Sequence, residues 1–173
     1  MTTALPPGWL PPEQFVPTLP HGLACAGLFF TDAAGRMLAL RSVRGPGQYV
    51  LPGGFLEAGE DLLGCARRET VEELGFLPAA ARSEDLRLLV LAFSAPEPPW
   101  PWRVGAFFDG GVLTDPEIGR IALDPVEHDA FTLRTVEELT ALADERRGLV
   151  LRAAAEARRT GRPDYVTLPA TSG

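Results

Sequence analysis

The chain has 173 residues, a length that suits one domain with a sizeable hydrophobic core. Its net charge of −7 argues against broad binding to nucleic-acid backbones, and no apolar run of about eighteen residues predicts a membrane span. Two cysteines are too few for a disulfide framework, and the N-terminus lacks a secretory pattern, so we expect a cytoplasmic protein. All 16 basic residues are arginine, which suits a local pocket for one small phosphorylated ligand.

The first segment, residues 1–20, carries six prolines and predicts neither a regular helix nor a central strand. We interpret it as a proline-rich N-terminal arm. Its Trp9 and Phe15 are expected to pack on the domain or on a second subunit, which would make a homodimer, while a role as a substrate lid is the alternative. No part of this segment offers a catalytic motif.

The following segments alternate between strand, turn and helix patterns. Strands are predicted at residues 23–30, 37–41 and 48–51, and Pro52-Gly53-Gly54 ends the third strand and permits close approach of the backbone. Helical periodicity runs from Asp61 to about Leu74, where Gly75 supplies a stop signal. Further strands are predicted at 86–93, 103–108 and 128–133, a proline-rich loop at 95–102, and helices at 136–143 and 147–159.

These elements predict one mixed α/β domain over residues 21–160, with a central helix between strands and a C-terminal tail at 161–173. The central helix is the most informative element. At about 100° per residue, Glu69, Glu72 and Glu73 fall within an arc of roughly 100°, so their carboxylates converge. A divalent cation such as Mg²⁺ would stabilise this cluster. The alternative is a solvated face with an Arg68–Glu72 ion pair, but one arginine cannot neutralise three glutamates.

The spacing around this helix resembles the signature of the Nudix hydrolase family. Gly54 is followed after five residues by Glu60, then after seven residues by Arg68-Glu69, then by Glu72-Glu73 and by Gly75. Thr70 and Phe76 stand where the family usually shows a bulky aliphatic residue, and both are packing positions. The resemblance implies a Nudix-type α/β/α sandwich with a mixed central sheet and a loop-helix-loop catalytic box.

The resemblance also implies a chemistry. Family members generally hydrolyse a diphosphate linkage attached to a nucleoside or similar group, with Mg²⁺ or Mn²⁺. Carried over, the metal ligands would be Glu69, Glu72, Glu73 and the carbonyl of Gly53. Arg68 would orient a glutamate of the box, and Glu60 would support the loop or the metal shell. The general base is either Glu73 or an acid on a later loop. Glu127 resembles a recurring family pattern there, and its rivals are Asp124, Asp129 and Glu117.

Substrate contacts are expected outside the box. Arg41 and Arg44 stand near the third strand, where guanidinium groups would grip phosphates, although solvation on the surface is an equal alternative for Arg44. Trp102, like Trp100, would either stack on a base or serve as a packing anchor. His128 at a strand boundary is expected to be structural, because the mechanism needs no histidine.

The leading hypothesis is therefore a metal-dependent hydrolase acting on a small nucleotide or nucleoside diphosphate derivative, with no membrane partner and no extended nucleic-acid surface. A non-catalytic Nudix-fold module that senses a nucleotide is the alternative, but such modules typically lose box glutamates and none is lost here. A related isomerase would need an active-site cysteine, and neither Cys25 nor Cys65 offers clear support.

Overall fold

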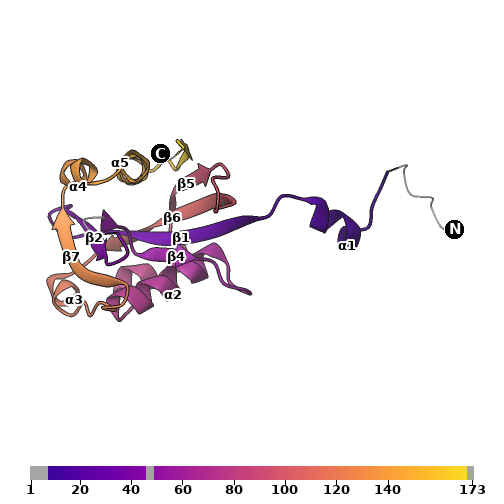
Figure 1. The fold of residues 1–173 in the computed structure, drawn as a ribbon. Helices are drawn as coiled ribbons and strands as arrows, with labels where there is room; N and C mark the ends of the chain where they lie inside the picture. The colour runs from indigo at the N-terminus through magenta and orange to yellow at the C-terminus, as the bar shows by residue number, and fades with distance from the viewer. Residues whose placement is uncertain (1–7, 46–48, 171–173) are drawn as a thin grey trace.

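One mixed sheet organises the chain, as the computed structural model in Figure 1 shows for residues 8–45 and 49–170. The central strand β1 (Gly22–Thr31) runs parallel to β6 (Trp102–Val112) and antiparallel to β4 (Gly53–Phe55), and near its end it meets β2 (Met37–Ser42). The main strand order is β3-β2-β1-β6-β5-β8, and β7 pairs with β2. The other strands are β3 (Tyr49–Val50), β5 (Leu88–Ser94), β7 (His128–Arg134) and β8 (Asp164–Leu168).

Helices cover both faces of this sheet, which confirms the predicted α/β/α sandwich (Figure 1). On one face, α2 (Leu62–Leu74) packs against β1 over a core that includes Leu28 and Phe30. On the other face, α4 (Val136–Leu142) and α5 (Glu145–Thr160) cover a second core that includes Phe29. The alternation of these side chains along β1 follows from the pleat of a strand buried on both sides. A short helix, α3 (Asp115–Gly119), follows β6.

The boundaries of α2 follow its sequence signals. Asp61 caps the helix, because its carboxylate accepts a hydrogen bond from the backbone N–H of Gly64. Gly75 ends it in the left-handed conformation that the predicted stop requires (φ 81°). Ala66, Thr70 and Leu74 are buried in the protein, and Glu73 is buried with them. The helix thus holds one of its carboxylates inside the protein.

Both ends of the chain contain structure that the sequence patterns did not predict. In the arm, α1 (Pro12–Phe15) and a 3-10 turn (Val16–Thr18) form although no helix was expected, because proline is compatible with a first helical turn. Trp9 and Phe15 remain 47% and 48% exposed, so neither is buried on the domain, and the arm projects away from the sheet (Figure 1).

At the other end, β8 lies within the predicted tail and pairs in parallel with β5, from Val90↔Asp164 to Ser94↔Leu168. A second 3-10 turn spans Ala79–Arg82. None of the helices among the described residues has both the length and the apolar character needed to cross a membrane.

Candidate active site

Close backbone approach positions the start of the catalytic box. The predicted turn at Gly53-Gly54 continues as β4, which pairs antiparallel with β1 at Gly27↔Gly53 and Ala26↔Gly54. A side chain at Gly53 would place its Cβ 2.4 Å from the carbonyl oxygen of Ala26. Glycine therefore allows the box to lie directly against the central strand, as the sequence predicted.

Glu73 links α2 to two other elements. One carboxylate oxygen accepts a hydrogen bond from the backbone N–H of Gly53 at 2.8 Å, and the other lies 2.7 Å from Nε2 of His128 at the start of β7. Glu73 and His128 are only 3% and 5% exposed. The carboxylate is thus fixed in position, and the structure places it between the box loop and β7.

Arg68 joins the other acids of the box. Its guanidinium group donates to Glu60 at 2.7 Å and to Glu69 and Glu72 at 2.9 Å each, and it also donates to the carbonyl of Phe55. These bonds raise the pKa of Arg68, and its hydrogen bond to Glu60 is the main cause that lowers the pKa of that carboxyl. The role of Arg68 in orienting a glutamate of the box stays a prediction.

Glu69 is more deeply buried than Glu72. Its side chain is 13% exposed, against 55% for Glu72, and it rests against Gly54. Burial is the main cause that raises the pKa of Glu69; Arg68 opposes it, while the charges of Glu73 and Glu72 add to it. The negative charge at this position is therefore only partly balanced by Arg68, and an additional cation would stabilise it.

The donor chemistry here fits a hard divalent cation. Glu73, Glu127 and His128 each offer a ligand atom, and these atoms lie within 4.8 Å of one another. With Glu69, Glu72 and the carbonyl of Gly53 nearby in the box, oxygen donors dominate, and these are the donors that Mg²⁺ and Mn²⁺ prefer. The geometry brings the predicted loop acid Glu127 to the box, because β7 pairs with β2 and begins beside Glu73.

His128 belongs to this cluster, although the sequence did not indicate its contact with Glu73. Burial alone lowers its pKa, but the hydrogen bond and the charge of Glu73, with the charge of Glu127, outweigh burial and raise that pKa. Its Nδ1 is buried without a hydrogen-bond partner among the described residues. No local pattern could have revealed this, since His128 and Glu73 are 55 residues apart.

The two predicted phosphate-binding arginines are both paired with acids of the β7 region. Arg41 donates to both carboxylate oxygens of Asp129 at 2.6 and 2.9 Å, and Arg44 donates to Glu127 at 2.7 Å. Their side chains are 41% and 73% exposed, so both can exchange these partners for a ligand. Their role in substrate binding stays a prediction.

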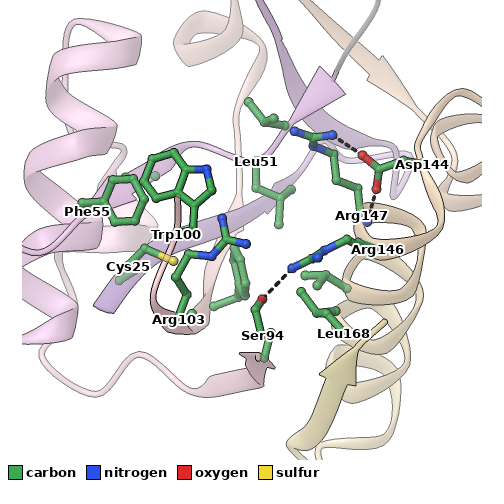
Figure 2. A pocket seen from close by; sticks show the side chains of 18 of the residues that line it. Cys25, Leu51, Phe55, Ser94, Trp100, Arg103, Asp144, Arg146, Arg147 and Leu168 are labelled. Carbon is green, nitrogen blue, oxygen red and sulfur yellow. Dashed lines mark hydrogen bonds and ion pairs between the residues drawn. The ribbon is translucent and has the colours of Figure 1, made fainter. Parts of the chain in front are cut away.

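A cavity of about 650 Å³ begins at Gly53 and Gly54 and extends between the sheet and α5 (Figure 2). Trp100 lines it and stacks on Phe55, with ring centroids 5.9 Å apart. Trp102, which the sequence favoured for substrate contact, does not line this cavity. Instead its indole N–H donates to the carbonyl of Pro20, and its ring covers Gly22. Trp102 therefore has the anchoring environment that was its alternative.

We predict that Gly54→Ala lowers kcat/KM by about 10- to 100-fold with little change in thermal stability. The new Cβ would lie 2.3 to 2.6 Å from the Glu69 carboxyl group, which would have to move from its place beside Arg68. Gly119→Ala is the matched control, because a Cβ there meets no atom within 4 Å. Steady-state hydrolysis assays and melting curves of both variants provide the measurement, and unchanged hydrolysis by Gly54→Ala would contradict the prediction.

Comparisons with known proteins agree with this geometry. The family model described as NUDIX domain matches residues 20–153. Similar solved structures include the MutT protein from Methanosarcina mazei Go1, with 19% identity, a TM-score of 0.60, and coverage of 80% of this chain and 94% of that one. A C. elegans Ap4A hydrolase has 22% identity and a TM-score of 0.60, with coverage of 80% of this chain and 98% of that one. An ADP-ribose pyrophosphatase from Streptococcus suis 89-1591 has 15% identity and a TM-score of 0.54, with coverage of 85% of this chain and 99% of that one. Identities this low show the fold alone, and no curated protein matches the chain.

Proposed function

Because this chain belongs to the Nudix family, whose domain model covers residues 20–153, we propose that it is a Mg²⁺- or Mn²⁺-dependent pyrophosphohydrolase. Its substrate would be a small molecule of nucleotide type that contains a diphosphate linkage. The observation that carries the proposal is the complete acidic set of α2, in which Glu73 is bound between the backbone of Gly53 and His128 while Glu69 and Glu72 share Arg68.

Each group has a role that its surroundings support. Glu69, Glu72, Glu73 and the carbonyl of Gly53 would hold the cation, which when bound neutralises phosphate oxygens and lowers the pKa of water. Arg68 keeps Glu60 and Glu69 in fixed orientations. Glu127 has a carboxylate oxygen within 4.8 Å of a carboxylate oxygen of Glu73. It is the candidate that accepts the proton of the attacking water. Arg41 and Arg44 would bind phosphate oxygens after leaving their carboxylate partners.

The test is a substrate panel with the purified protein. Nucleoside triphosphates, ADP-ribose, dinucleoside polyphosphates, NADH and CoA are incubated with Mg²⁺, with Mn²⁺ or with a chelator, and released phosphate or nucleotide is measured. We expect turnover of at least one nucleotide with either cation and none with the chelator. Tight nucleotide binding without turnover of any compound would overturn the proposal in favour of a nucleotide sensor.

A further inference from the structure

The walls of the cavity that begins at Gly53 favour a flat ring. The stacked rings of Phe55 and Trp100 are 44% and 45% exposed, and they are inclined by only 17°, so they form an open aromatic platform. Phe107 and Leu51 add apolar surface deeper in the cavity. Gly105 also lines the cavity, and the absence of a Cβ there lets the Phe107 ring and the Cys25 sulfur pack against the backbone. Such a site buries a planar, largely apolar ligand well.

One buried donor in this cavity lacks an acceptor. Arg103 extends from β6 into the cavity beside Trp100, with its guanidinium carbon 5.3 Å from the centroid of that ring (Figure 2). Its Nε is buried without a hydrogen bond, and within residues 8–45 and 49–170 the side chain forms no ion pair. No acceptor among the described residues occupies the guanidinium group, so its terminal N–H groups are available to a ligand that brings acceptor atoms.

The neighbouring arginines of the cavity are already paired. Arg146 donates to Glu97 at 3.1 Å. Figure 2 shows its hydrogen bond to Ser94, at 2.8 Å, and the pair of Arg147 with Asp144. The lining therefore combines three arginines with two acids, which leaves one positive charge. One net charge beside two carboxylates disfavours a second phosphate group here and favours a neutral ring with acceptor atoms on its edge.

The position of Arg103 along the sheet agrees with a base bound beyond the phosphates. Gly54 pairs with Ala26, and Ala26 pairs with Ala106, which is three residues from Arg103 along β6. Three residues of strand correspond to about 10 Å. A substrate whose phosphates lie at the box would thus place a ribose along the cavity and the far edge of its base at Arg103.

We propose that Arg103 determines base specificity and selects a purine that carries a carbonyl group at C6. This inference rests on the proposed function. A guanidinium group matches the two adjacent acceptors O6 and N7 of such a ring, whereas the C6 amino group of adenine would direct a donor at a donor. Uracil offers no such adjacent pair, because its donor N3–H lies between its two carbonyl groups. Trp100 supplies the stacking surface, which is indifferent to the base.

The test compares IMP with AMP, which differ at C6, by metal-free titration calorimetry. The wild-type protein is expected to bind IMP about 10-fold or more tightly than AMP. In Arg103→Gln the preference should reverse, because glutamine pairs with N6 and N7 of adenine. Trp100→Ala should weaken the binding of both ligands without changing the ratio of their affinities. Arg120→Gln is the matched control, since Arg120 also lies over a ring, 3.8 Å from the centroid of Phe76, but does not line the cavity.

The outcomes separate this inference from the proposed function. Equal affinities in the wild type, a preference for AMP, an absence of binding, or an unchanged ratio in folded Arg103→Gln would overturn the assignment of Arg103. If the IMP to AMP affinity ratio reverses in Arg103→Gln but the wild type hydrolyses no compound of the substrate panel, the base site is supported and the proposed function fails. If Arg103→Gln does not fold, the wild-type ratio and the Trp100→Ala titration still decide the matter, because both are expected to show the preference for IMP.

Discussion

Glu73→Gln is expected to reduce kcat by about 1,000-fold while the fold stays intact. Glutamine has the same shape, and its carbonyl can still accept the hydrogen bond from the backbone N–H of Gly53. His128 can accommodate the new amide by a change of tautomer, because its Nε2 can accept a hydrogen bond from the amide instead of donating one to the carboxylate. What disappears is the negative charge at the centre of the predicted cation site.

Two measurements separate this effect from misfolding. Melting curves should nearly coincide for the wild type and Glu73→Gln, whereas calorimetric titration with Mg²⁺ should show weakened binding. Glu57→Gln is the matched control, because it removes the same charge from the adjacent loop at a side chain that is 70% exposed and approaches Arg68 only to 4.0 Å. Near-normal turnover by Glu73→Gln, or an equal loss in Glu57→Gln, would refute the assignment of Glu73.

The sequence predicted the part of the site that depends on local spacing. The acids of α2 and its stop lie within one segment, so helical periodicity and the signature were sufficient to predict them. The structure confirms the sandwich for the same reason: alternating strand and helix patterns determine which faces must be covered.

The remaining part depends on contacts between distant segments. Arg103, Arg146 and Trp100 meet only after β6, the 97–100 loop and α5 have packed around one cavity. The two tryptophans, Trp100 and Trp102, are close in sequence but have different surroundings. Trp102 begins β6 and packs on Gly22, whereas Trp100, two residues earlier, forms a bridge with Glu97 and faces the cavity. A run of prolines and tryptophans contains no signal for that change of direction.

Arg68→Ala is expected to lower both stability and activity. Arg68 is 23% exposed and pairs with Glu60, Glu69 and Glu72 and, at 4.0 Å, with Glu57. Its removal leaves four carboxylates without their shared cation and the carbonyl of Phe55 without this donor. We expect the melting temperature at neutral pH to fall by about 5 to 10 °C. Arg68→Lys should restore only part of this loss, because an ammonium group cannot reproduce the planar donor geometry.

The sign of the pH dependence provides a sharper criterion. In the wild type the pKa of Glu60 is lowered, chiefly by Arg68, so this contribution to stability is present above the unfolded pKa and is lost as the pH falls through the folded pKa. The difference in melting temperature between the wild type and Arg68→Ala should therefore be largest near pH 7 and shrink below about pH 4.5, the ordinary pKa of glutamate.

Arg159→Ala supplies the matched control, because Arg159 forms an exposed pair with Glu156 and is itself 71% exposed. Its melting temperature should stay close to that of the wild type. A saturating concentration of Mg²⁺ should also recover part of the stability of Arg68→Ala, since a bound cation replaces some of the missing charge among the carboxylates. A pH-independent loss of stability in Arg68→Ala, with no response to Mg²⁺, would mean that Arg68 acts by packing alone and not as the charge partner of the box.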